Sequence, residues 1–134
     1  MDAIIVIVPA KIVPQIIAQA AAKEAKGVVI MSARFKEVGN VALEKEILKI
    51  ARKHSLRLMG PNIQGFNYLP NNLCVMFMRV IKTRGPIAVI SQSGSITTVL
   101  SEWAKNDGLS SLQLLIWEVK PNSCKSIALG SLFG

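Results

Sequence analysis

Short apolar runs alternate with amphipathic segments along the first half of the chain. Mostly apolar runs lie at residues 3–8, 28–31 and 56–59, and proline or small polar residues follow each of them. Such runs are typical of buried parallel strands. Residues 15–26 and 42–54 carry apolar residues at helical spacing. This order predicts an α/β fold in which right-handed crossovers join parallel strands, a Rossmann-like sheet.

Residues 66–84 interrupt this alternation of predicted strands and helices. Pro70-Asn71-Asn72 predicts a turn, and residues 76–78 predict either a short strand or an apolar plug. A connection of this length in a compact domain usually serves function or marks a boundary. We place a boundary at residues 82–85, where a new strand–turn–helix unit starts. The sequence therefore predicts two partial domains, at residues 1–82 and 83–134.

The second part opens with a strand, a small polar turn and a helix. The strand is predicted at residues 87–90, the Ser-Gln-Ser-Gly-Ser turn occupies residues 91–95, and the helix extends through Trp103 and Ala104. Such a turn presents backbone N–H groups and serine hydroxyls at the positive end of a helix dipole. Since the turn contains no acid, base or metal ligand, we predict a binding place for a phosphate or another oxyanion.

Small or polar residues also follow the three strands of the first part. They lie at residues 8–11, 31–34 and 60–65. Ligands of open parallel sheets bind outside the carboxyl ends of the strands. Each segment alone is equally consistent with ordinary turn chemistry, but all three end at the same edge of the sheet. Together they predict a ligand crevice there.

Composition narrows the class of protein. The chain has 134 residues, of which 51% are hydrophobic and 5% aromatic, which suits one α/β domain or pieces of two. Its apolar runs are shorter than the ~20 residues that a membrane span needs. Asp2 and the absence of a basic N-terminal region argue against a secretory signal. Cys74 and Cys124 lack metal-ligand spacing and form no disulfide framework. We expect a cytoplasmic protein that does not contact membranes.

The formal charge of +8 permits several partners. The basic residues are scattered, so solvated helix faces are the simplest interpretation, followed by attraction of a polyphosphate cofactor. The sequence argues against nucleic acid as a partner because dense basic blocks and interleaved aromatic residues are lacking. His54 is the only histidine, and we expect it at the surface. We find no Ser-His-Asp arrangement, no glycine-rich nucleotide loop and no metal site, and we assign no catalytic residue.

Four segments appear in an order that resembles a known family. They are Ala-Ile-Ile-Val-Ile-Val-Pro-Ala-Lys-Ile-Val-Pro, Gly-Val-Val-Ile-Met-Ser-Ala-Arg-Phe-Lys-Glu-Val-Gly, Leu-Met-Gly-Pro-Asn and Gly-Pro-Ile-Ala-Val-Ile-Ser-Gln-Ser-Gly. The family is the α-type chain of nucleoside-diphosphate-forming acyl-CoA synthetases: ADP-forming acetyl-CoA synthetases, related to the succinyl-CoA synthetase α subunit. The resemblance covers about residues 2–110. It implies a Rossmann-like CoA-binding domain followed by the start of a flavodoxin-like ligase domain.

The resemblance also implies site residues. In the family an acyl phosphate forms, and a histidine then carries its phosphoryl group to a nucleoside diphosphate. By this resemblance, coenzyme A contacts Val8, Pro9, Ala10, Lys11, Met31, Ser32 and Ala33. The phosphohistidine and acyl substrate contact Asn62, Ser91, Ser93, Gly94 and Thr98. ADP or ATP with Mg would act only through missing or partner domains.

Several departures from the family limit these expectations. The chain begins midway through the family's first domain, and His54 does not match the phosphorylated histidine. Arg34 replaces a glycine, Ile63-Gln64 replace a cysteine and a small or apolar residue, and residues from about 113 depart from the pattern. We therefore expect a truncated chain that is not catalytic alone and that pairs with a β-type subunit or with itself. The alternatives are a stand-alone CoA- or nucleotide-binding module, a basic nucleic-acid-binding protein, and a subunit completed by a chain carrying the histidine.

Overall fold

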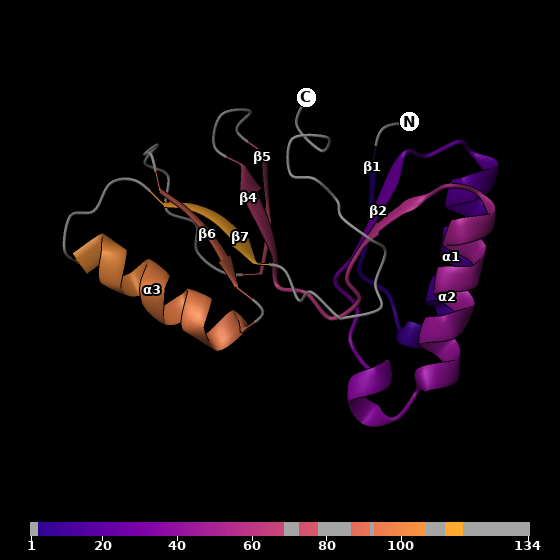
Figure 1. Ribbon diagram of the computed structural model, residues 1–134, viewed down its shortest axis with the longest axis horizontal. Helices are drawn as coiled ribbons and strands as arrows, with labels where there is room; N and C mark the ends of the chain where they lie inside the picture. The colour runs from indigo at the N-terminus through magenta and orange to yellow at the C-terminus, as the bar shows by residue number, and fades with distance from the viewer. Residues whose placement is uncertain (1–2, 69–72, 78–86, 92, 107–111, 117–134) are drawn as a thin grey trace. The chain divides into compact units, whose positions relative to one another are not determined.

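The computed structural model describes residues 3–68, 73–77, 87–91, 93–106 and 112–116. These residues form two compact units that divide after Asn62. The first contains β1 to β3 with α1 and α2, and the second contains β4 to β7 with α3 (Figure 1). Each unit is described on its own.

The first unit is a parallel sheet of three strands in the order β1-β2-β3. The strands are β1 (Ala3–Val6), β2 (Gly27–Ile30) and β3 (Arg57–Met59). The helices α1 (Val13–Ala22) and α2 (Val41–Lys53) connect successive strands, contact each other and lie on the same side of the sheet (Figure 1). The predicted α/β order and the Rossmann-like parallel sheet are therefore confirmed.

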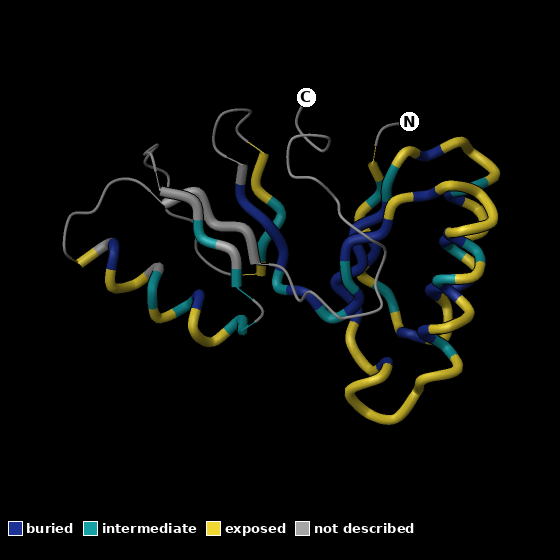
Figure 2. The backbone as a smooth tube through the Cα atoms, in the orientation of Figure 1, coloured by how far each residue is buried: buried dark blue, intermediate teal, exposed yellow. Residues whose placement is uncertain are grey.

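The core of this unit lies between the helices and the sheet. Buried residues recur at helical spacing in α1 and α2, and Figure 2 shows exposed residues between them. Removing one such aliphatic side chain from water contributes about 1.5–3 kcal/mol. The fully buried members with large side chains are Val6, Val13, Ile17, Val28, Ile30, Phe35 and Ile47.

The first helix has different bounds from the predicted residues 15–26. A 3-10 turn, η1 (Ala10–Ile12), leads directly into α1. The helix ends at Ala22 because Glu24 adopts a left-handed conformation with φ 54°. The N–H of Ala25 then donates to the Ala20 carbonyl at 3.1 Å. The alanine-rich pattern runs on beyond this point, but the backbone has already turned toward β2. The helix α2 lies within one residue of its predicted bounds.

The second unit is a mixed sheet in the order β5-β4-β7-β6. The strand β6 (Ile87–Ser91) pairs in parallel with β7 (Leu112–Ile116), and α3 (Gly94–Asn106) connects them and contacts both. The predicted strand–turn–helix unit is present, although Gln92 lies outside the described residues. The segment predicted to depart from the family at about residue 113 supplies β7.

The interval predicted as a long connection contains two strands. β4 (Gly65–Tyr68) and β5 (Leu73–Met76) form an antiparallel pair, and β4 also pairs with β7. The prediction of an apolar plug is wrong for Phe77, whose side chain is 65% exposed. The predicted turn at 70–72 and Met78 lie outside the described residues.

The compact units divide earlier than the predicted domain boundary. The division follows Asn62 because β4 and β5 belong to the second sheet. Residues 82–85, where the sequence places the boundary, lie outside the described residues. The division of the whole chain into domains at 1–82 and 83–134 stays a prediction.

Candidate functional site

Ser32 joins the three strand ends of the first unit. The N–H of Val8 donates to Ser32 Oγ at 3.0 Å, and that hydroxyl lies 3.5 Å from the Val6 carbonyl oxygen. The N–H of Asn62 donates to the Ser32 carbonyl at 3.0 Å. Segments from the ends of β1, β2 and β3 thus meet at one edge of the sheet. We call the residues 8–11, 31–34 and 60–62 around this junction the strand-end edge.

The segment after β1 places a lysine at the strand-end edge. Pro9 has an extended backbone, and its carbonyl accepts a hydrogen bond from the N–H of Ile12 at 2.9 Å. Ala10 is buried at the start of the resulting 3-10 turn, and Lys11 is exposed. This part of the edge therefore presents a small residue beside a cationic side chain.

The segment after β2 is a loop fixed by its own hydrogen bonds. The N–H of Arg34 donates to a carboxylate oxygen of Glu37 at 2.5 Å, and Asn40 Nδ2 donates to the Arg34 carbonyl at 2.8 Å. Phe35 is fully buried and anchors the loop in the core. Another carboxylate oxygen, Glu44 Oε2, accepts the N–H of Lys36 at 3.3 Å. This loop has a defined path, which includes the short 3-10 turn η2 (Lys36–Val38).

The third segment depends on a glycine. Gly60 has φ 99°, a conformation that side-chain-bearing residues rarely adopt. A Cβ placed on Gly60 would overlap the carbonyl oxygen of Ile30 in β2. The close approach of these two backbones brings Asn62 to Ser32. Asn62 itself has φ 60°, which asparagine tolerates better than most residues.

The N-terminus of α3 forms a compact group of hydroxyls in the second unit. Ser91 Oγ accepts the N–H of Ser93 at 3.0 Å, and Ser93 Oγ accepts the N–H of Ile96 at 3.4 Å. Ser93 and Ser95 hydroxyls lie 3.2 Å apart. The Thr98 hydroxyl donates to the Gly94 carbonyl at 2.9 Å. The turn thus has the geometry of a helix N-cap, and it exposes the positive end of the helix dipole.

Gln64 adds a side chain that the sequence had marked only as a departure from the family. A Cβ on Gly94 would overlap the carboxamide of Gln64, so this amide lies against the first residue of α3. Gln64 Oε1 and Asn67 Oδ1 are buried without a hydrogen-bond partner among the described residues. A polar side chain next to a glycine-started helix was not recognisable from spacing alone, because thirty residues separate the two positions.

The described residues contain no other arrangement typical of a reaction centre. They form no cluster of three potential metal ligands, and none of their helices is long and apolar enough to cross a membrane. His54 is exposed at the end of α2, as predicted for a surface histidine. Desolvation raises the pKa of the Cys74 thiol, opposed by a backbone hydrogen bond with Met76, so this exposed cysteine stays protonated at neutral pH.

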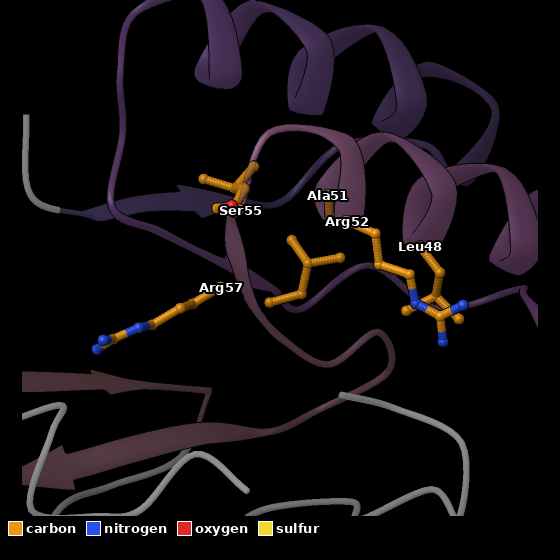
Figure 3. A pocket seen from close by; sticks show the side chains of 7 residues that line it. Leu48, Ala51, Arg52, Ser55 and Arg57 are labelled. Carbon is orange, nitrogen blue, oxygen red and sulfur yellow. The ribbon is translucent and has the colours of Figure 1, made fainter. Parts of the chain in front are cut away.

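A separate cavity of about 290 Å³ lies at the opposite end of the first sheet. It opens where α2 ends and β3 begins, whereas the strand-end edge lies beyond the carboxyl ends of the strands. Figure 3 shows Arg52 and Arg57 extending in opposite directions beside an apolar interior. The lining residues are Leu48, Ala51, Arg52, Ser55, Leu56, Arg57 and Leu58. None of them is a predicted site residue.

A parallel α/β sheet whose strand ends meet at one edge has the architecture in which open α/β proteins bind ligands, outside the carboxyl ends of the strands. Comparison with known proteins specifies the class. Residues 1–68 match the CoA binding domain family, and the chain belongs to this family. The resemblance drawn from the sequence is confirmed, since the curated relatives include ADP-forming acetate–CoA ligases.

Two relatives illustrate the extent of the match. The chain is 36% identical over 111 residues to acetate–CoA ligase (ADP-forming) I of Archaeoglobus fulgidus, covering 81% of this chain and 16% of that protein. It is 38% identical over 105 residues to the α subunit of acetate–CoA ligase (ADP-forming) I of Pyrococcus furiosus, covering 77% of this chain and 23% of that subunit. The chain therefore spans less than a quarter of the length of these relatives.

A solved structure gives the same result. The apo form of dinucleotide-forming acetyl-coenzyme A synthetase 1 from Ca. Korarchaeum cryptofilum superposes with a TM-score of 0.81 at 30% identity, covering 94% of this chain and 27% of that one. Sequence and structure thus agree that the chain resembles the CoA-binding α portion of an ADP-forming acetyl-CoA synthetase.

Proposed function

We propose that the chain binds coenzyme A at the strand-end edge, as the CoA-binding portion of an ADP-forming acyl-CoA ligase. The observation that carries this proposal is the junction at Ser32, which joins three segments within the residues that match the CoA binding domain family. Small residues let a ligand approach the backbone, and exposed Lys11 supplies a cation for its phosphates. The proposed contacts are Val8, Pro9, Ala10, Lys11, Met31, Ser32 and Ala33.

Calorimetric titration of the whole chain with coenzyme A tests this proposal. We expect saturable binding that Ala33→Leu weakens at least tenfold, because a larger side chain would occupy the exposed position beside Ser32. Ala22→Leu, also at an exposed alanine but at the end of α1, is the matched control and leaves the affinity unchanged. Absence of CoA binding by the unaltered chain would refute the proposal.

The same titration separates this function from nucleic-acid binding, the alternative suggested by the positive charge. A nucleic-acid-binding protein would bind a mixed-sequence oligonucleotide with a steep salt dependence and ignore coenzyme A. We expect the reverse order of affinities in 0.15 M salt, near the physiological ionic strength.

We further propose that the N-terminus of α3 binds, without covalent transfer, the phosphoryl group of a phosphohistidine that lies outside this unit. The capped turn at Ser93 and the helix dipole support this role, with Ser91, Ser93, Gly94 and Thr98 as the contacting residues. Residues 63–118 contain no histidine. A β-type subunit or another part of a longer protein would supply it, together with ADP and Mg.

Phosphate titration observed by NMR tests the anion site. We expect inorganic phosphate to shift the amide resonances of Gly94, Ser95 and Ile96. Ser95→Asp should abolish these shifts because a carboxylate at the helix start repels phosphate, whereas Ser95→Ala should preserve them. Unchanged resonances in the unaltered chain would refute the site.

Catalytic dependence on a partner has its own test. We expect no acid-labile phosphate on the chain after incubation with ATP and Mg, and no acetyl-CoA after addition of acetate and coenzyme A. Phosphate incorporation by the chain alone would refute the dependence.

A further inference from the structure

Arg34 occupies a backbone conformation that its residue type disfavours. Its φ is 77°, in the left-handed region where the Cβ of an L-residue crowds the following carbonyl oxygen. Long side chains are uncommon there, and glycine adopts the same conformation without crowding. An arginine at this position therefore makes the free energy of folding less favourable, and another property of the residue must offset this cost.

Neighbouring residues impose this conformation. Glu37 accepts the N–H of Arg34, and Asn40 donates to its carbonyl at 2.8 Å. The next residue, Phe35, is fully buried, and its carbonyl accepts the N–H of Asn40 at 2.9 Å. Both backbone polar groups of Arg34 are thus occupied within a fixed loop. The loop would keep this path with any residue that tolerates the left-handed region.

The side chain of Arg34 plays no part in holding the loop. It is exposed, and its guanidinium forms no hydrogen bond or ion pair with the described residues. Packing does not explain the arginine, and neither does backbone preference. This leaves a contact between the guanidinium and a group outside the described structure as the explanation.

The position of Arg34 indicates which kind of group its guanidinium contacts. It lies two residues after Ser32, on the strand-end edge, where Lys11 supplies the other exposed cation. A guanidinium presents several N–H donors in a planar fork that matches phosphate oxygens. Because the loop backbone is fixed, the charge is held at this edge with less freedom to lose on binding.

We propose that Arg34 is a phosphate-binding residue for coenzyme A, and that this contact offsets its disfavoured backbone conformation. The inference rests on the proposed function, since it assigns a contact to the same edge. The phosphate is either the 3′-phosphate of the ribose or the pyrophosphate, which share the chemistry that a guanidinium recognises.

Two variants of the whole chain separate the charge from the backbone. Arg34→Gln removes the charge and retains a side chain in the left-handed region, so CoA affinity should fall about tenfold or more with a nearly unchanged melting temperature. Arg34→Gly should lose the same affinity and raise the melting temperature, because glycine relieves the crowding. Ser55→Gly is the matched control: Ser55 also has a positive φ, 52°, but lies where β3 is about to begin. It should raise the melting temperature and leave CoA affinity unchanged.

Salt dependence and a truncated ligand complete the test. The affinity of the unaltered chain should fall with salt more steeply than that of Arg34→Gln, a difference that a purely structural residue would not produce. Loss of the Arg34→Gln effect with 3′-dephospho-CoA assigns the contact to the 3′-phosphate, and its persistence assigns it to the pyrophosphate. Equal CoA affinity and salt slope for Arg34→Gln and the unaltered chain would overturn the inference while leaving CoA binding intact. Failure of the unaltered chain to bind CoA would instead refute the proposed function.

Discussion

The strand-end edge and the N-terminus of α3 are both suited to anions, but they are built in different ways. At the strand-end edge, the hydroxyl of Ser32 meets backbone groups that lie 24 and 26 residues away in sequence. At α3, the hydrogen bonds of Ser93 and Thr98 reach partners no more than four residues away. The first site exists only once the sheet has formed, whereas the second needs little more than a strand followed by a helix.

This difference has a consequence for variants. A change that separates two strands should destroy the strand-end edge as a whole, while a change at α3 should have a local effect. Destabilising substitutions in the two regions can therefore test whether the contrast between long-range and local construction is real.

The largest expected effect is that of Gly60→Ala. The added Cβ would overlap the Ile30 carbonyl, and alanine is strained at φ 99°, so we expect a loss of about 3 kcal/mol or more in unfolding free energy. Gly39→Ala is the matched control, because Gly39 has φ 85° but no atom within 4 Å of its added Cβ. It should lose only about 1 kcal/mol. Urea denaturation measures both, and similar losses would argue against the close approach of β2 and the Gly60 turn.

The contact between Gly94 and Gln64 is the corresponding test in the second unit. Gly94→Ala should lose about 1–3 kcal/mol because the new methyl group overlaps the Gln64 carboxamide. Gln64→Ala should remove most of this penalty in the double variant, since the smaller side chain leaves room. A double-mutant cycle by urea denaturation gives the coupling between the two positions. Additive losses would contradict the contact.

The same contrast explains what could be predicted from the sequence. The parallel sheet, α2 and the α3 turn were predictable because their signals lie within short windows of residues. The antiparallel pair of β4 and β5 was not predicted, since Gly65–Tyr68 has only four residues and is stabilised by pairing with β5 and β7. The packing of Gln64 on Gly94 likewise depends on tertiary structure. For Arg34, the sequence showed an arginine in place of the family's glycine. Only the backbone conformation, and a guanidinium without a partner among the described residues, gave the residue a proposed role.

Smaller losses of stability are expected from the alanine substitutions of Ser32 and Ser93, one in each site. Ser32→Ala leaves the N–H of Val8 without its acceptor, so we expect a loss of about 1–3 kcal/mol together with weaker CoA binding. Ser93→Ala removes a helix cap, with an expected loss of about 1 kcal/mol and no change in CoA affinity. Thermal unfolding and calorimetry on the same samples provide both readouts. Weaker CoA binding in Ser93→Ala would show that the two sites are coupled.

The smallest effect on stability is expected on the face of β1 that the helices do not cover. Ile5 is 46% exposed there, whereas Val6 beside it is buried, and parallel sheets normally have both faces covered. Self-association through this face would shelter it, so Ile5→Lys should shift sedimentation toward the monomer and change the unfolding free energy by no more than about 0.5 kcal/mol. Val38→Lys, at an apolar residue in η2 (Lys36–Val38) that is 55% exposed, is the control and should leave sedimentation unchanged. If the unaltered chain already sediments as a monomer, the exposed face does not drive self-association, and a different polypeptide becomes the better candidate to cover it.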